Sequence, residues 1–188
     1  GKTADGAVWL DAQRTSPYQF RQFWMQMADA DVVKYLPQFS LASMEEISAL
    51  LATHLSDPGK RIAQRTLATE LTVLVHGADA SRDAEAAAEI LFGGDPNGAT
   101  REALQAVASE VPNTVVTRED LDDVFGLLAR SGVASSTSDA RRSVDQGGIK
   151  VNGQTLEKGE TLASKGILHD RWVLVRKGKT TYHVLTLA

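Results

Sequence analysis

Two adjacent arginines, Arg141 and Arg142, are the side chains of this sequence best suited to binding phosphate. A guanidinium group presents a planar fork of N–H donors that matches phosphate oxygens. The arginines follow Ser136 and Asp139, whose three-residue spacing is typical of a capping box at the start of a helix. The sequence therefore predicts a helix from Ser136 with both arginines on its exposed side. A solvated helix without a ligand is the alternative.

A glycine pair at 147 and 148 is expected to end this helix, because glycine adopts the left-handed conformation without a Cβ clash. The alternating residues 149–151 then indicate a half-buried strand that contains Lys150. Asn152 and the glycine after it favour a two-residue hairpin turn with positive φ at both positions. Lys150 and Asn152 become candidate contacts for a nucleic-acid backbone. An ordinary hairpin after a solvated helix remains the alternative.

The strings Ser138–Arg142 and Gln146–Gly153 together resemble the S-four RNA-binding domain. The resemblance implies that this helix and hairpin bind RNA. Further along the chain, Arg176, Lys177 and Lys179 cluster at an expected turn between two strands, where they could contact phosphate. Such a basic turn is also a common solubilising feature. Residues 118–188 hold 11 Lys+Arg and 9 Asp+Glu, although the whole chain has a net charge of −4. The basic end of the chain is thus the end expected to meet nucleic acid.

Three other strings resemble bacterial tyrosyl-tRNA synthetases. They read G-K-T-x-x-G-A-V-W-L-D at the start, then T-S-P-Y-Q-F-x-Q-F-W, and G-K-R-x-A-Q-x-x-L-A-x-E-x-T-x-x-V-H-G at 59–77. In that family G-K-T ends the signature loop of the class I catalytic domain. The resemblance implies that Lys2 and Thr3 are catalytic and that Lys2 binds the pyrophosphate part of ATP. A terminal lysine without a role is the alternative. A P-loop is not indicated, because no glycine stands five residues upstream.

Residues 17–92 are expected to form a helical bundle with short loops. The expected helices begin at Ser16-Pro17, span 31–36 before Pro37, and continue over 43–55, 57–76 and 80–91. By resemblance this bundle is the anticodon-binding domain. Asp29 and Asp31 could accept hydrogen bonds from a guanine edge, and plain helix capping is the alternative. Lys60 and Arg61, with Arg65 nearby, begin a helix and could approach an RNA backbone.

The sequence predicts an α+β fold, with an all-α bundle followed by a small α+β RNA-binding domain. The expected organisation is 1–16 as the end of the signature loop and connector, 17–92 as the anticodon-binding domain, 93–117 as a linker and 118–188 as the S-four-type domain. The linker is expected to hold a short helix over about 101–109, and Thr117 with Asp120 is expected to cap the next helix. Strands are expected at 149–151, 154–162, 171–176 and 180–187.

Composition limits the remaining possibilities. The chain has no cysteine and no apolar run long enough for a membrane helix, and no signal peptide is recognised at its start. These features fit a cytoplasmic protein. The histidines have no ligand spacing among them, so no metal site is expected. They are His54, His76, His169 and His183.

The resemblances together imply that the chain is the C-terminal part of an ATP-dependent tyrosine–tRNA ligase, expected to be inactive alone. The expected partner is tyrosine tRNA, with tyrosine and the Mg²⁺ complex of ATP bound by the full enzyme and no cofactor bound by this chain alone. A homodimer is expected through the catalytic domain that precedes Lys2 in the family. A non-catalytic RNA-binding or regulatory protein built from the same domains is the main alternative. A purely structural helical scaffold would show no salt-dependent affinity for RNA.

Overall fold

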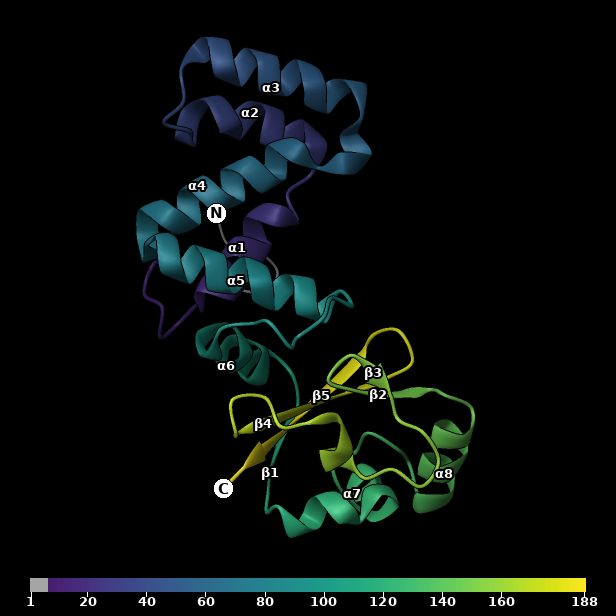
Figure 1. The fold of residues 1–188 in the computed structure, drawn as a ribbon. Coiled ribbons are helices and arrows are strands. Elements are labelled where there is room, and N and C mark those ends of the chain that lie inside the picture. The colour runs from purple at the N-terminus through teal and green to yellow at the C-terminus, as the bar shows by residue number, and fades with distance from the viewer. Residues whose placement is uncertain (1–6) are drawn as a thin grey trace. The chain divides into compact units, whose positions relative to one another are not determined.

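A computed structural model describes residues 7–188, and their contacts divide the chain into two compact units, residues up to Glu85 and residues 86–188 (Figure 1). The first unit is helical, and the second is built on a five-stranded sheet with helices. This arrangement confirms the predicted α+β fold. Within residues 7–188, no helix is both long and apolar enough to cross a membrane.

Two helices of the first unit, α1 (Pro17–Met25) and α3 (Met44–Ser56), begin at the predicted capping residues. Ser16 accepts a hydrogen bond from the Gln19 amide at 3.1 Å, and Ser43 and Glu46 form a complete capping box. Such caps satisfy amide groups that lack a partner in the first turn of a helix. The helices are α1 (Pro17–Met25), α2 (Asp29–Phe39), α3 (Met44–Ser56), α4 (Ile62–His76) and the first part of α5 (Ala78–Leu91).

Helix α2 is longer than the sequence indicated, because it includes Asp29 and continues through Pro37. The prediction that it would stop before Pro37 is wrong. A proline removes one amide donor, but the Ser40 amide still donates to the Leu36 carbonyl at 2.9 Å. Val32 and Leu36 are fully buried, so packing maintains the last turn of the helix.

Helix α4 packs against α1, α2 and α3 and forms the centre of the helical unit. It starts later than expected: Pro58–Lys60 forms a 3-10 turn, Arg61 has a left-handed φ of 52°, and the helix begins at Ile62. The apolar core draws on all four helices, and its buried members are Phe20, Val32, Leu36, Ile47, Ala63, Leu67 and Leu71.

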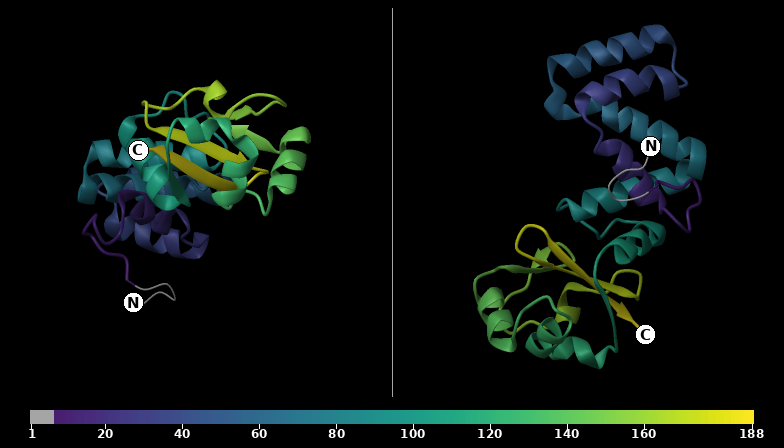
Figure 2. Two further views of the ribbon diagram at one scale, coloured as in Figure 1. Left: turned by 90° about the horizontal axis from the view of Figure 1, so that it is seen from below. Right: turned by 180° about the vertical axis from the view of Figure 1, so that it is seen from behind.

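The sheet of the second unit has the strand order β1-β5-β4-β2-β3. Strand β1 is parallel to β5, and the other neighbours are antiparallel (Figure 2). The strands are β1 (Asn113–Val116), β2 (Ile149–Val151), β3 (Gln154–Thr155), β4 (Trp172–Lys177) and β5 (Thr181–Leu187). The predicted turn at Asn152 is present, with φ of 48° there and 83° at Gly153.

Helices α7 (Val124–Arg130) and α8 (Thr137–Asp145) cover one face of this sheet. Alternate residues of β2 and β4, including Val151 and Val175, point into the core between helices and sheet. On the opposite face Trp172 and Leu174 are also buried, and α6 (Arg101–Glu110) contacts β5. The segment expected as a linker thus provides both α6 and strand β1.

Candidate functional site

Helix α8 places the two predicted phosphate-binding arginines on its exposed side. Ser136 caps the helix by accepting the Asp139 amide at 3.1 Å, as the sequence indicated. Ala140 and Val144 are buried against the sheet, so Arg141 and Arg142 lie on the solvent side. The helix therefore has one face that holds the fold and one that is open to a ligand.

The exposed face of α8 borders a shallow hollow of about 390 Å³. Arg141 lies with its guanidinium 5.1 Å from the centre of the Phe125 ring, a cation–π distance. The Arg142 side chain is 67% exposed, and its Nη2 lies 3.9 Å from an Asp139 oxygen. That distance is too long for a hydrogen bond, so the guanidinium donors remain available to a ligand. Donors of this kind suit phosphate. The lining residues are Thr137, Ser138, Arg141, Arg142, Asp145 and Gln146.

Lys177 reaches α8 from the end of β4, but its charge is already paired. Its Nζ donates to Asp139 Oδ2 at 2.6 Å, and Asp139 also accepts from the backbone and hydroxyl of Ser135. The hydrogen bond from Lys177, followed by the one from the Ser135 amide, lowers the pKa of Asp139 from 3.8 to about 2. Lys177 therefore ties the strand to the helix and offers less charge to a ligand than the arginines do.

Lys150 and Arg176 lie opposite each other on neighbouring strands, on the sheet face away from α8. Their neighbours Val151 and Val175 point into the core beneath α8, and side chains alternate along a strand. Arg176 donates to the Tyr182 hydroxyl at 3.2 Å. The structure thus divides the predicted basic residues between two sides of the sheet. Lys179 is exposed in the turn between β4 and β5.

Asn152 is a correction to the sequence analysis, because its side chain is fully buried and cannot contact RNA directly. Its Nδ2 donates to the carbonyls of Lys165 and Gly166 at 3.2 and 2.9 Å, and its Oδ1 accepts the Leu174 amide at 2.8 Å. The side chain therefore joins the hairpin turn, the loop at 165–166 and strand β4. Its role in this unit is structural.

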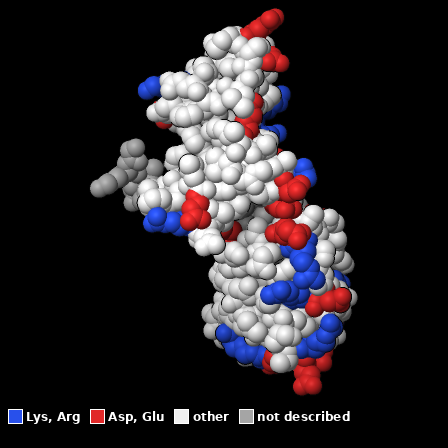
Figure 3. All heavy atoms as spheres, turned by 90° about the vertical axis from the view of Figure 1, so that its left-hand side faces the viewer, with Lys and Arg blue, Asp and Glu red and all other residues white. Residues whose placement is uncertain are grey.

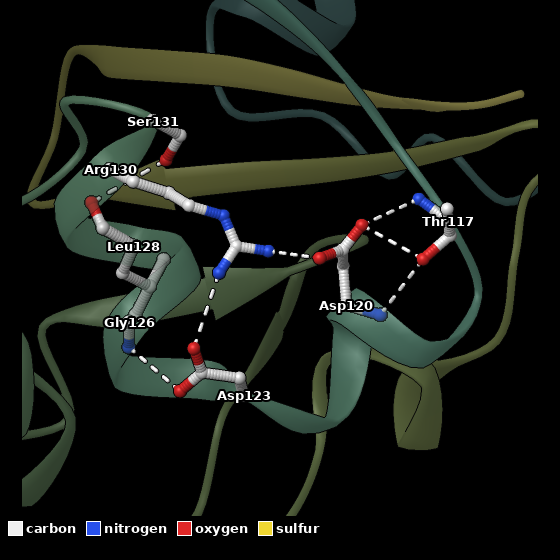
Figure 4. Close-up of polar contacts among 7 residues, drawn as sticks. All are labelled: Thr117, Asp120, Asp123, Gly126, Leu128, Arg130 and Ser131. Carbon is white, nitrogen blue, oxygen red and sulfur yellow. Dashed lines mark hydrogen bonds and ion pairs between the residues drawn. The ribbon is translucent and has the colours of Figure 1, made fainter.

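A charged cluster that the sequence analysis missed fixes the start of α7 (Figure 4). Arg130 pairs with Asp120 and, at 3.2 Å, with Asp123. Thr117 donates from its amide and hydroxyl to Asp120, which lowers the pKa of that carboxyl. Asp123, not Asp120, caps α7 by accepting the Gly126 amide.

This cluster contributes to the candidate site indirectly, through helix α7. It orients α7, and Phe125 of α7 lies under the Arg141 guanidinium. The Thr117–Asp120 spacing was visible in the sequence, whereas the pairing with Arg130, ten residues later, depends on the turn at 119–122.

In the helical unit, Arg61 already has structural partners. Its Nη2 donates to the carbonyls of Met25, the last residue of α1, and Met27, at 2.6 and 3.0 Å. Lys60 is exposed and lies 3.2 Å from an Asp57 oxygen. The neighbouring Arg65 is exposed on α4. Lys60 and Arg65 are therefore more accessible to a nucleic acid than Arg61.

Asp29 and Asp31 lie in the first turn of α2, where the helix dipole stabilises negative charge. Asp31 is exposed, and the Asp29 side chain is 51% exposed. Asp29 Oδ1 accepts from Gln64 Nε2 at 2.7 Å and lies 3.3 Å from His54 Nε2. No local pattern in the sequence indicated these two partners, which lie 25 and 35 residues away.

The space-filling view shows a group of Lys and Arg side chains on the 86–188 unit, bordered by Asp and Glu (Figure 3). Residues 86–188 hold 12 Lys+Arg and 13 Asp+Glu, so this mixed surface agrees with a nearly balanced charge, and the small positive balance belongs to residues 118–188 alone. The two residues predicted to be catalytic, Lys2 and Thr3, lie outside the residues that the structure describes.

Comparison with known proteins covers nearly the whole chain. Residues 1–93 match the family of class I tRNA synthetases for tryptophan and tyrosine (W and Y), and residues 102–185 match the "Tyrosine--tRNA ligase SYY-like C-terminal domain". A tyrosine–tRNA ligase of Anaeromyxobacter dehalogenans is 45% identical over 186 residues, which are 97% of this chain and 44% of that protein. One of Geobacillus stearothermophilus is 40% identical over 189 residues, covering 100% of this chain and 45% of the relative.

The chain thus spans less than half the length of these curated relatives. Among solved structures, a C-terminally truncated mitochondrial tyrosyl-tRNA synthetase of Coccidioides posadasii is 41% identical, with a TM-score of 0.42. The match covers 45% of this chain and 24% of that one.

Proposed function

The chain belongs to the tyrosine–tRNA ligase family, and we propose that it is the tRNA-binding part of an enzyme that attaches tyrosine to its tRNA with ATP. The main support is that two family models match successive parts of the chain in order. In the whole ligase we expect ATP with Mg²⁺, tyrosine and tyrosine tRNA as ligands. We also expect two copies to associate through a catalytic domain outside this chain, in the cytoplasm.

The 86–188 unit is proposed to hold the tRNA backbone on the exposed face of α8. Arg141 and Arg142 are exposed there, and both border the hollow described above. Each phosphate that such a residue neutralises releases counterions from the RNA, so binding should weaken as salt rises. Lys150, Arg176 and Lys179 are proposed as secondary contacts on the other face of the sheet and in its turn.

The helical unit is proposed to bind the anticodon region. Asp29 and Asp31 would accept hydrogen bonds from base edges, while Lys60 would contact the backbone. Arg61 is proposed to act there mainly by holding the end of α1. In the whole ligase, Lys2 and Thr3 are proposed to contribute to the site for the phosphates of ATP.

Binding of the 188-residue chain to tyrosine tRNA and to a second tRNA, across a salt series, tests the proposal. We expect tighter binding of tyrosine tRNA and an affinity that falls steeply with salt. Replacing Arg141 or Arg142 by Ala should weaken binding and reduce the slope of log affinity against log salt by about 1 each.

Lys158→Ala is the matched control, because Lys158 is an exposed cation of the same unit outside the α8 face. It should leave both affinity and slope nearly unchanged. Equal, salt-insensitive affinity of the wild-type chain for both tRNAs would reject the proposed function.

A further inference from the structure

Two fully buried polar side chains, His54 and Gln64, lie beside Asp29. The contacts described above leave some of their nitrogen and oxygen atoms without a hydrogen bond. His54 comes from the last turn of α3 and Gln64 from the first turn of α4, and both are 0% exposed. Within the described residues, neither ring nitrogen of His54 has a hydrogen-bond partner. Gln64 Oε1 also has no hydrogen-bond partner there. Buried polar groups are rarely left unpaired, so such a cluster requires a physical explanation.

Both side chains face the same atom. Gln64 Nε2 donates to Asp29 Oδ1 at 2.7 Å and lies 3.3 Å from the Met27 carbonyl. His54 Nε2 is 3.3 Å from the same Oδ1, so a ring that carries its hydrogen on Nε2 can donate to it after a small rotation. Because the Asp29 side chain is still 51% exposed, the carboxylate is held from the protein side and open on the solvent side.

We propose that His54 and Gln64 are positioning residues that orient the Asp29 carboxylate toward the Watson–Crick edge of a guanine in the bound tRNA. The inference rests on the proposed function and extends it to base selectivity. Guanine is the base that places two N–H donors, N1–H and the 2-amino group, side by side on this edge. A carboxylate is acceptor-only and can receive both.

The other bases fit the held carboxylate less well. Adenine and cytosine place a ring nitrogen acceptor beside their amino group, and that lone pair would face a carboxylate oxygen. A bidentate contact also needs the plane of the carboxylate to be fixed before binding, because a freely rotating Asp loses rotamer freedom when it binds. Holding Oδ1 from two helices removes much of that cost.

The test uses tyrosine tRNA and versions in which each guanine of the anticodon loop is replaced in turn by inosine, which lacks only the 2-amino group. For the wild-type chain, we expect replacement at one guanine to weaken binding about tenfold, as loss of one hydrogen bond to a charged group does. His54→Leu and Gln64→Leu should each reduce this penalty to about threefold or less. His54→Gln, whose amide can reach the position of Nε2, should restore much of it.

Thr72→Val is the matched control. Thr72 is a fully buried polar residue of the same helix as Gln64, but its hydroxyl donates only to the Ala68 carbonyl. This variant should keep the tenfold penalty even if it lowers stability. Circular dichroism and thermal unfolding identify any variant that fails to fold, and Gln64→Leu and His54→Gln decide the question if His54→Leu is one of these.

The outcomes separate the two proposals. If the wild-type chain binds tyrosine tRNA with a tenfold inosine penalty, and His54→Leu and Gln64→Leu keep that penalty, the positioning role is overturned and the proposed function stands. If tRNA binds but no inosine replacement matters, the positioning role is again overturned. If the wild-type chain does not bind tRNA selectively, the proposed function fails, and the inference that rests on it fails too.

Discussion

In the helical unit the candidate RNA-binding residues also hold the fold, whereas in the 86–188 unit the two roles are largely separate. Arg61 closes the end of α1 through two carbonyls, and Asp29 accepts from buried Gln64. By contrast, Arg141 and Arg142 project from the solvent side of α8, and buried Asn152 performs the structural task.

This difference has a physical origin. A helical bundle with short connections leaves carbonyls and carboxylates at its helix ends, and long side chains from the next helix satisfy them. A sheet satisfies most of its backbone within its own ladders, so surface side chains of a covering helix are free of that task. Substitutions should therefore affect stability and binding together in the first unit and separately in the second.

The largest expected effect is on stability, for Asn152→Leu. Three hydrogen bonds are lost and buried backbone groups are left unpaired, so the free energy of unfolding of this unit should fall by about 2–4 kcal/mol. Chemical denaturation, with hydrogen exchange of the Leu174 amide, measures it. Gln154→Leu, an exposed change in the same hairpin, should stay within about 0.5 kcal/mol. Equal effects of the two variants would contradict the structural role of Asn152.

Arg61→Ala should destabilise the helical unit by about 1–3 kcal/mol, because two carbonyls lose their charged donor. The neighbouring exposed Arg65→Ala should change stability by less than about 0.5 kcal/mol. Thermal unfolding and tRNA binding should be measured on both variants. The contrast between the units would break down if Arg61→Ala weakened tRNA binding without any loss of stability.

Replacing Arg141 and Arg142 together by Ala should weaken tRNA binding about tenfold or more, yet change the free energy of unfolding by less than about 0.5 kcal/mol. Both side chains are exposed, and the buried face of α8 is untouched. Denaturation curves measure the free energy of unfolding, and binding isotherms at the same salt concentration measure the affinity for tRNA. A loss of stability as large as that of Arg61→Ala would show that α8 also depends on these residues.

The smallest expected effect concerns pH and the Asp139–Lys177 pair. The pKa of Asp139 is about 2 in the folded chain, below its ordinary value of 3.8. Its contribution to stability is therefore complete above about pH 4 and is lost as pH falls through about 2. Asp139→Asn should flatten the pH dependence of unfolding between these values.

Wild-type and variant chains can be compared by urea denaturation at several pH values. Asp145→Asn, an exposed carboxylate on the same helix, serves as the control. Identical pH profiles for the wild-type chain and Asp139→Asn would show that the ion pair contributes nothing to stability.

Local signals in the sequence predicted much of the fold. Ser16, Ser43 and Ser136 cap helices as expected, and the turn after Val151 has the predicted positive φ values. These features depend on residues within one turn of each other. The exposed arginines of α8 could be predicted for the same reason.

Features that depend on distant contacts were missed. Strand β1 consists of four residues whose parallel partner, β5, lies about seventy residues later. In α3 the apolar Leu55 is 63% exposed, while its polar neighbour His54 is fully buried beside Asp29, which is the reverse of what hydrophobicity alone predicts. Asn152 looked like an exposed turn residue because nothing local shows that the loop at 165–166 covers it.

The position of β5 between β1 and β4 has a consequence for folding kinetics. Neither neighbour can complete its ladder until Thr181–Leu187 is in place, and the only strand that pairs with β1 in the described sheet lies about seventy residues later. Closing so long a loop slows folding, because its entropy is lost before any contact compensates. The 86–188 unit should thus acquire its sheet late, and removal of residues 181–188 would leave two strands with unpaired edges open to association with other chains.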